Sequence, residues 1–529
     1  MRKPLDVRLV PAALVAWGSA AVLAPAGTRT SVTAAVVAAC AAAVVAVLHV
    51  AGPGRTSDGI AVLTLAVAAT VAASAAVTAA RASSTLADDA AASGATVRLT
   101  ATVTSDPRPI RAPWEDGPPS RSSVTLRVTR IETGPELSRR AAQDVRLPVS
   151  VVGGGAWTDV AYGTSITTSG TLRPADSSRP ERYELVRPTR PELVAPENAP
   201  LRVAARVRAG LAATVADRDA DVAGLVRGMT VGDRAALAPE LDEAMRTTGL
   251  THLTAVSGAH VVIVVGTLLA LLVLLKVPPA GRVAVLVVAL AAFVLLVRPD
   301  ASVLRAAAMG SVALLGIAAG RPASALPALG TSVVVLLVVD PWLARSFGFV
   351  LSVVATGALV LGASPLAAAL ERRRVPSWLA LLVAVPTVAQ LACGPVVVLL
   401  SPTLPTYAVL ANVLVTPVVA PATVSGVLAA LLSTASPGLA EVVVLPACWA
   451  ADWIARVSTT LAGWPGAALP WPEGVPGAVL LAAATLTAWA AVAAIPAVRW
   501  SWQDARVRHR RARSVARSRR PASGVRACR

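Results

Sequence analysis

The chain of 529 residues is 55% hydrophobic and only 15% charged, whereas soluble proteins carry about 25% charged residues. This composition excludes an ordinary soluble globular protein. The net charge of +18 suggests a nucleic-acid ligand at first sight, but eleven arginines and one aspartate lie between Arg499 and Arg529 alone. A basic segment directly after an apolar one is typical of a cytoplasmic end. We therefore interpret residues 499–529 as a basic cytoplasmic tail that contacts anionic lipid, with nucleic-acid contact as the alternative.

Three apolar blocks open the chain, at about 9–26, 32–50 and 60–80. As a helix, each is long enough to cross about 30 Å of hydrocarbon. Residues 1–80 are therefore predicted to form N-terminal transmembrane helices, the first of them an uncleaved anchor. Basic residues before the first block place the N-terminus inside the cell, so three crossings leave the next region outside.

Residues 81–200 form the only sizeable polar stretch. Apolar and polar residues alternate at about 97–103, 124–129, 145–151 and 165–172, which predicts half-buried strands. Four or five short strands in about 100 residues indicate a small extracytoplasmic barrel, such as an OB-fold, and a β-sandwich is the alternative. Aromatic side chains could stack on bases and arginine could contact phosphate. The DNA-binding candidates in this domain are Trp114, Arg127 and Trp157.

The remainder of the chain divides into a charged and an apolar part. Residues 201–248 predict amphipathic helices at the membrane surface, with breaks near Gly228 and Gly232. Residues 249–498 contain nine further apolar blocks, which brings the total to about twelve transmembrane helices. The fold class is therefore an all-α polytopic membrane bundle with an inserted β-barrel. Prolines within the late blocks predict interrupted helices, which are tolerated where they line a cavity.

The densest group of intramembrane polar residues runs from Gly249 to Val261 and includes His252, Ser257, Gly258 and His260. Four interpretations compete. His252 and His260 are eight residues apart, about 80° around a helix, and no carboxylate is near, which argues against a metal site. Ser257 beside a histidine suggests a nucleophile, but a third orienting group is missing. Polar glue between helices and the lining or hinge of a conduit both fit.

Other polar residues stand alone in apolar blocks, where they are costly and usually face the bundle interior. A buried arginine needs a partner or water and could meet a phosphate, or it could extend to the membrane surface. An aspartate before proline more often ends a helix, and isolated hydroxyl and amide groups more often bond between helices. These candidates are Arg305, Asp340, Ser352, Gln390 and Asn412.

Several short motifs in this region resemble those of the ComEC family of competence DNA-uptake channels. They include Gly232-Asp233-Arg234, Gly249-Leu250-Thr251-His252-Leu253 and Ser257-Gly258-Ala259-His260-Val261. Arg305-Ala306 before Met309, Asp340-Pro341 before Gly348-Phe349-Val350-Leu351-Ser352, and the segments Gln390…Pro395 and Asn412…Pro417 also look like elements of that family. The resemblance covers about residues 220–430 well and the N-terminal part more loosely.

The resemblance implies an inner-membrane protein that passes single-stranded DNA inward during natural transformation, with both termini cytoplasmic. The conduit candidates it adds are Asp233 and Arg234. It implies as partners membrane lipids, a membrane-anchored DNA receptor, and a cytoplasmic helicase or single-strand-binding proteins. The nuclease motif of many family members, His-x-His-x-Asp-His, is not found in this sequence, so we expect a separate nuclease.

We expect no catalysis, no cofactor and no metal, because the sequence has no P-loop, no His-Glu-x-x-His and no cysteine-rich motif. A small-molecule or lipid transporter of the plasma membrane is the second hypothesis, and it requires a closed site at the membrane midplane. A membrane-embedded hydrolase that uses Ser257 or a histidine-bound metal is the third, and it requires a carboxylate or third ligand beside the histidines.

Overall fold

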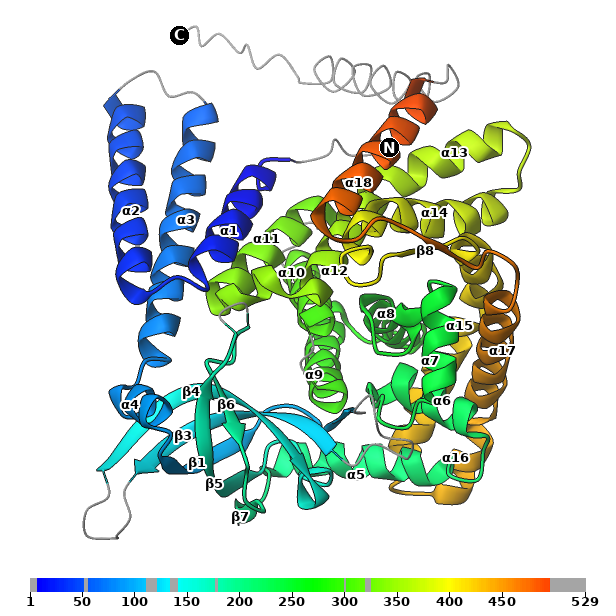
Figure 1. Ribbon diagram of the computed structural model, residues 1–529. Helices are drawn as coiled ribbons and strands as arrows, with labels where there is room; N and C mark the ends of the chain where they lie inside the picture. Colours follow the sequence, from blue (N-terminus) through cyan, green and yellow to red (C-terminus); the bar gives the residue numbers. More distant parts are fainter. Residues whose placement is uncertain are drawn as a thin grey trace, which may run out of the picture.

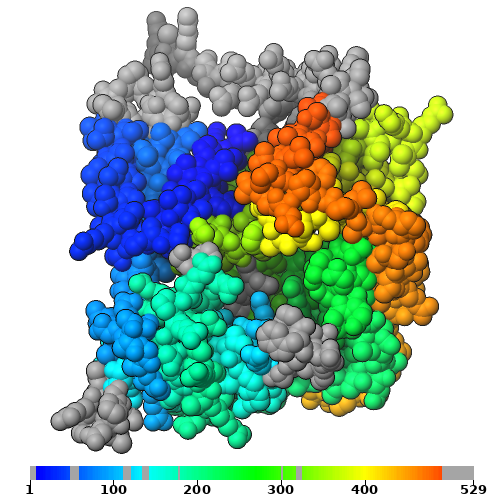
Figure 2. All heavy atoms as spheres, in the orientation of Figure 1, coloured from blue at the N-terminus to red at the C-terminus, as the bar shows by residue number. Residues whose placement is uncertain are grey.

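The computed structural model describes residues 7–51, 56–110, 121–133, 141–176, 179–298, 301–318 and 325–494. Three parts are visible in Figure 1: a group of N-terminal helices, a β domain below them, and a larger set of helices beside both. Figure 2 shows the β domain as a block of cyan and teal spheres, below the dark-blue N-terminal helices and beside the green segment.

The N-terminal helices are α1 (Val10–Leu23), α2 (Thr28–Ala51) and α3 (Thr56–Arg81). Alanine dominates them, and small side chains let helix backbones approach closely in a membrane. Ala16 and Ala20 of α1 are fully buried against Val71 of α3 and against residues of α11 (Ala325–Val339). The N-terminal helices are therefore attached to the later part of the chain.

The β domain contains the four predicted strands as β1 (Thr96–Val103), β3 (Arg121–Thr133), β4 (Ala141–Gly154) and β5 (Ser165–Pro174). Three short strands add to them: β2 (Arg108–Ile110), β6 (Tyr183–Val186) and β7 (Glu192–Ala195). The alternation seen in the sequence corresponds to burial, since every second residue of β1 from Val97 onward is buried. Helix α4 (Thr85–Ser93) connects α3 to this domain and packs on its core through Ala87 and Ala90.

Strand pairing in the β domain returns to its starting point. The order is β1-β3-β4-β6-β5, and β5 pairs again with β1. All of these pairs are antiparallel except β4 with β6, which is parallel. Side chains from all five strands meet in one apolar core that also holds Trp157 and Tyr183.

Three helices follow the β domain: α5 (Ala199–Thr214), α6 (Ala220–Val231) and α7 (Pro239–Thr247). Helix α5 runs along the bottom of Figure 1, from the β domain to α16 (Pro437–Val443). The predicted break at Gly232 is confirmed, since Gly232 ends α6 with a φ of 72°. The break at Gly228 is wrong. Gly228 lies inside α6, where a Cβ atom would stand 2.5 Å from the Thr254 carbonyl oxygen, so its role is close packing.

The remaining helices are apolar. They are α8 (Gly258–Leu274), α9 (Pro279–Val297), α10 (Ala301–Ala318), α11, α12 (Phe347–Ala358), α13 (Ser364–Arg372), α14 (Ser377–Val397), α15 (Ala408–Leu432), α16, α17 (Leu445–Ala462) and α18 (Gly474–Ala494). In the described part of the chain, six helices are long and apolar enough to cross a membrane, or seven if the bent pair α16–α17 is one span; α12 and α13 count together as one continuous helix, Phe347–Arg372. Five shorter apolar helices accompany them.

The predicted proline interruptions are wrong. Pro386 and Pro395 lie inside α14, and Pro417 and Pro421 lie inside α15, yet each helix continues to its end. A proline removes one backbone hydrogen bond, and neighbouring helices and hydroxyl groups can satisfy the carbonyl that it frees.

Candidate functional site

The polar segment around Ser257 forms the beginning of α8. Ser257 is the N-cap, with extended backbone, and His260 is three residues further on. The Ser257 backbone amide donates to Nδ1 of His260 at 3.0 Å, and the Ser257 hydroxyl lies 2.9 Å from the same nitrogen. This reciprocal arrangement is a capping box in which histidine takes the place of the usual glutamate. It satisfies donors at the helix start and fixes the orientation of the imidazole.

His260 is fully buried. Within the described residues, its Nε2 atom has no hydrogen-bond partner. A buried polar atom without a partner is costly, and in native structures such atoms cluster at functional sites or meet an unseen water or ligand. The Ser257–His260 pair therefore leaves one polar atom available for a further contact.

Arg305 of α10 is the second element of this region, and it is 6% exposed. Its Nε donates to the Ser352 hydroxyl of α12 at 2.6 Å, and its Nη1 lies 3.1 Å from the Met309 sulfur. Gly258 packs against the same guanidinium, because a Cβ atom there would stand 2.9 Å from Nη2. The structure thus brings together Ser257, Gly258, His260, Arg305 and Ser352 from three helices.

The electrostatics of this Arg305 site are unbalanced. Among the described residues, no carboxylate forms an ion pair with Arg305. Its guanidinium also lies against the first residue of α8, and a helix N-terminus carries a partial positive charge. Two positive groups at one place favour an anion.

His252 lies on a 3₁₀ turn, Thr251–Leu253, and its side chain is exposed. Because α8 begins only at Gly258, the helical offset between His252 and His260 does not apply, and that part of the sequence argument was wrong. Across the residues described, no group of three His, Cys, Asp or Glu side chains is placed to hold a metal ion.

Three further candidates make local contacts. Asp340 caps the 3₁₀ helix Pro341–Arg345 by accepting from the Trp342 amide at 3.0 Å. Asn412 donates to the Ala408 carbonyl of its own helix at 2.8 Å. Gln390 is half-buried on α14. None of these three takes part in the contacts described for Arg305.

Asp233 lies in the turn after α6. It accepts from Nε and Nη2 of Arg227, at 3.1 and 2.5 Å, and from the Ala235 amide at 3.1 Å. Burial alone would raise the pKa of Asp233, but its hydrogen bonds with Arg227 and the nearby guanidinium charges hold that pKa below its usual range. Arg234 is exposed. The Gly232-Asp233-Arg234 turn is therefore stabilised mainly from its own helix.

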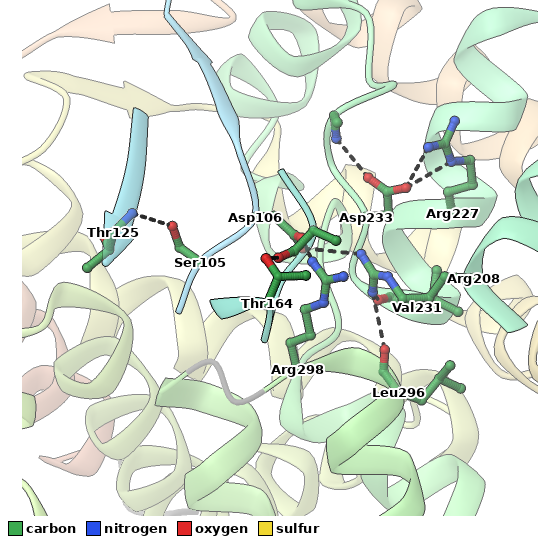
Figure 3. Close-up of polar contacts among 12 residues, drawn as sticks. Ser105, Asp106, Thr125, Thr164, Arg208, Arg227, Val231, Asp233, Leu296 and Arg298 are labelled. Atoms are coloured by element: carbon green, nitrogen blue, oxygen red, sulfur yellow. Dashed lines mark hydrogen bonds and ion pairs between the residues drawn. The ribbon is translucent and has the colours of Figure 1, made fainter. Parts of the chain in front are cut away.

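A larger ion cluster lies where the β domain meets the helices (Figure 3). Asp106, in the loop after β1, pairs with Arg298 at the end of α9 and with Arg208 of α5, the latter at 3.3 Å. Arg208 also donates to the carbonyl oxygens of Val231 and, at 3.2 Å, Leu296. The Arg298 guanidinium lies over the Tyr162 ring, 4.8 Å from its centroid. We call Asp106, Tyr162, Arg208 and Arg298 the junction cluster.

No pattern in the sequence indicates this cluster. Asp106 and Arg208 are 102 residues apart, and no motif marks either of them. The sequence gives one local indication, because Arg208 lies in an amphipathic stretch that contains several arginines. The exposed Arg206 lies in the same stretch, so this indication does not distinguish Arg208 from it. Met309 was noticed only as part of a motif.

The candidates in the β domain have different surroundings. Arg127 is exposed on β3 and interacts electrostatically with Tyr162 and with Asp340, so it faces the helices. Trp157 is 2% exposed in the core and donates to the Thr189 carbonyl at 3.1 Å, which leaves its ring no free face. Trp114 lies outside the described residues.

These features define the class of the protein, a helical membrane protein with an attached β domain. One arginine is buried among the helices, and others lie where the β domain meets the helices. The comparisons then identify the family. The model of the competence protein family matches residues 229–496, half of the chain. The chain therefore belongs to the competence protein family.

One curated relative can be aligned over a shorter region. ComE operon protein 3 of Bacillus subtilis (strain 168) is 32% identical over 176 residues. The alignment covers 33% of this chain but only 22% of the relative, so the chain spans a small share of that protein's length. No solved structure matches the chain.

Proposed function

We propose that this chain is an inner-membrane channel that takes up single-stranded DNA during natural transformation. The observation that carries the proposal is Arg305. A buried guanidinium keeps its charge, and its described partners are a neutral hydroxyl and a thioether. Together with the N-terminus of α8 it offers a positive site inside a membrane protein of the competence family. A passing phosphodiester is the anion that such a protein would meet.

The other intramembrane candidates take supporting roles in this proposal. Ser257 and Gly258 hold the first turn of α8 against Arg305, and Ser352 orients the guanidinium. His260 presents its Nε2 atom, which has no partner among the described residues, and His252 lies nearby, bonded to the Gly249 backbone. In this proposal Asp340 caps a short 3₁₀ helix, Asn412 bonds the backbone of its own helix, and Gln390 lies half-buried on α14, all beside the conduit. Asp233 and Arg234 form the turn at the end of α6, and this turn holds the helix in place next to the proposed conduit.

The β domain supports the proposal by its topology. A five-stranded ring in which the third and last strands are parallel is the arrangement of an OB-fold, and the second and third strands of that fold bind oligonucleotides. Here those strands are β3 and β4, and β3 presents Arg127 toward the helices. We infer that a strand crosses this OB-like surface before it reaches the helices.

The proposal includes twelve crossings and cytoplasmic termini. The six long helices, the bent pair and the five shorter apolar helices together supply twelve candidates. The apolar stretches of the five shorter helices, 14 to 17 residues long, can cross where the bilayer thins or where neighbours pack around them. Membrane lipids, a DNA receptor, a cytoplasmic helicase or single-strand-binding protein, and a separate nuclease are the proposed partners.

Deletion of the gene in a transformable host tests the proposal. We expect uptake of labelled DNA into the cytoplasm to be lost while DNA binding at the cell surface remains, because the channel acts after capture. Re-expression of the chain should restore uptake. Normal transformation of the deletion strain would reject the channel and would favour a transporter of small molecules or lipids.

A further inference from the structure

The junction cluster has the composition of an anion site that is already occupied. Guanidinium groups from two separate elements, α5 and the end of α9, converge on the single carboxylate of Asp106. Arginine's planar donors match the oxygens of a carboxylate and of a phosphate equally well. Asp106 belongs to a different domain from both arginines, and it arrives on a loop rather than on a rigid element.

The charges around the cluster leave an excess of positive groups. Arg208 also interacts with the Asp233–Arg227 pair, so three arginines and two aspartates form one network. Burial lowers the pKa of Arg208, because desolvation disfavours the charged form. Arg208 is therefore held by protein groups at rest, through Asp106 and the two carbonyl oxygens.

Asp106 and Arg298 remain within reach of a ligand. Their side chains are 39% and 20% exposed, whereas that of Arg208 is 9% exposed. Arg298 stacks on Tyr162, and Tyr162 in turn interacts with exposed Arg127. Arg127, Arg298 and Arg208 thus follow one another along the contact between the β domain and the helices.

We propose that Arg298 and Arg208 form a phosphodiester site on the path of the strand, and that Asp106 occupies this site when no strand is bound. Binding of a strand exchanges one anion for another, so the arginines stay compensated throughout. The loop of Asp106 is released at the same time, and the contact between the β domain and the helices loosens. This inference rests on the proposed function, because it assigns the ligand as a nucleic-acid strand.

The loop has few attachments besides the ion pairs. The Thr104 amide donates to the Thr125 carbonyl at 2.9 Å, and the Ser105 hydroxyl accepts from the Thr125 amide at 2.8 Å. Both bonds hold the loop to β3 and not to the helices. Loss of the Asp106 ion pairs can therefore free the junction without unfolding the β domain.

Oligonucleotide binding by the full chain tests the inference. The protein is placed in nanodiscs of zwitterionic lipid, and fluorescence anisotropy measures its affinity for a single-stranded oligonucleotide. In Asp106→Asn the competing charge is gone, so we expect binding to tighten by about tenfold, the equivalent of about 1.4 kcal/mol. Arg298→Gln should weaken binding, and Asp144→Asn, at an exposed position of the same domain, should leave it unchanged.

A second measurement uses the unaltered protein. Hydrogen–deuterium exchange at the amides of Ser105 and Asp106 should rise when the oligonucleotide is added, because the loop is released, whereas the Thr104 amide keeps its bond to the Thr125 carbonyl and should exchange as before. An oligonucleotide with an uncharged methylphosphonate backbone should have no such effect. Anionic lipid in the nanodisc should have none either, and a rise caused by lipid alone would assign the site to lipid headgroups and overturn the inference.

The two proposals fail in different ways. If Asp106→Asn leaves affinity unchanged or weaker while the unaltered protein binds the strand, the exchange at the junction is rejected and the channel stands. If exchange of the loop stays unchanged when the strand binds, the result is the same. If the unaltered protein binds no oligonucleotide, the inference falls together with the proposed encounter at the β domain.

Discussion

Among the described residues, the buried arginines Arg208 and Arg305 lie in two different regions, and their partners differ. Around Arg305, the described contacts are with the neutral Ser352 and Met309, in helices of the membrane part. In the junction cluster, Arg208 and Arg298 share the carboxylate of Asp106. An arginine whose partners are all neutral can bind an incoming anion directly. An arginine that is already paired with a carboxylate stabilises the fold, and an incoming anion must first replace that carboxylate.

The first prediction tests the Arg305 site. We expect Arg305→Gln to lower DNA uptake by about 100-fold, because a charge-assisted contact contributes about 1.5–3 kcal/mol and each 1.4 kcal/mol corresponds to a factor of ten. Arg305→Lys keeps the charge but loses the planar donors, so its DNA uptake should lie between that of the unaltered protein and that of Arg305→Gln. Membrane expression and thermal stability should change little, and both are measured beside uptake of labelled DNA.

The control for Arg305 is Arg282→Gln. Arg282 lies on α9, and its Nε donates to the Val277 carbonyl at 2.6 Å. This variant removes an equal charge from another helix of the same bundle, and uptake should stay near the unaltered level. Normal uptake in a well-expressed Arg305→Gln protein would show that uptake does not need Arg305. The contrast between the two regions would then have no consequence for function.

The second prediction tests the junction cluster at rest. Arg208→Gln should lower the free energy of unfolding by about 1.5–3 kcal/mol, the contribution of hydrogen bonds to a charged group, because Asp106 is 39% exposed and keeps its ion pair with Arg298. It also frees the carbonyl oxygens of Val231 and Leu296. The matched variant Arg206→Gln changes an exposed arginine of the same helix and should have almost no effect. Thermal unfolding in detergent measures both, and equal effects would refute a specific role for Arg208.

The two regions also differ in how far the sequence could predict them. The Arg305 site is built from short motifs, since Ser257 and His260 are three residues apart and form one capping box. The strands of the β domain were predictable for the same reason, because burial in β1 follows the alternation of its residues. The junction cluster depends on chain topology, and nothing near Asp106 in the sequence indicates Arg208.

Two predictions from the sequence were wrong, and each concerned where a helix begins or breaks. The offset between His252 and His260 assumed a continuous helix, but Ser257 caps α8 and the preceding residues form a 3₁₀ turn. Gly228 was taken for a helix break, although a helix accepts glycine where another backbone approaches closely. A local cap at Ser257 decides the first case, and the close approach of the Thr254 backbone to Gly228 decides the second.

The third prediction sharpens the geometry at Arg305. Gly258→Ala would place a Cβ atom 2.9 Å from Nη2 of Arg305, so the guanidinium must shift. Overpacking of this kind costs about 1–3 kcal/mol, and we expect uptake to fall by about tenfold. Gly266→Ala on the same helix meets nothing within 4 Å and serves as the control. Equal uptake in the two variants would show that the position of the guanidinium is unimportant.

The smallest expected effect concerns the β domain alone, away from both arginine regions. Burial, together with a hydrogen bond from the phenol to Asp88 and the charge of Asp88, raises the pKa of Tyr183 from 10.0 to about 12. Below pH 10 the folded and unfolded chains both keep this proton, and the full stabilisation is present. Between pH 10 and 12 the unfolded chain loses its proton first, so the free energy of unfolding falls as the pH rises.

Tyr183→Phe should therefore lower the free energy of unfolding by about 1 kcal/mol at neutral pH, the contribution of one hydrogen bond, and should remove the alkaline decrease that Tyr183 causes. Unfolding followed across pH 8 to 12, with tyrosinate absorbance as the second signal, measures both effects. Tyr407→Phe removes a phenol from the helical part, where it donates to the Pro465 carbonyl, and should leave the decrease in place. If Tyr183→Phe keeps the decrease, Tyr183 is not its source. DNA uptake at neutral pH should be almost unchanged in Tyr183→Phe, because Tyr183 takes no part in the ion pairs that Asp106 makes with Arg208 and Arg298 between the β domain and the helices.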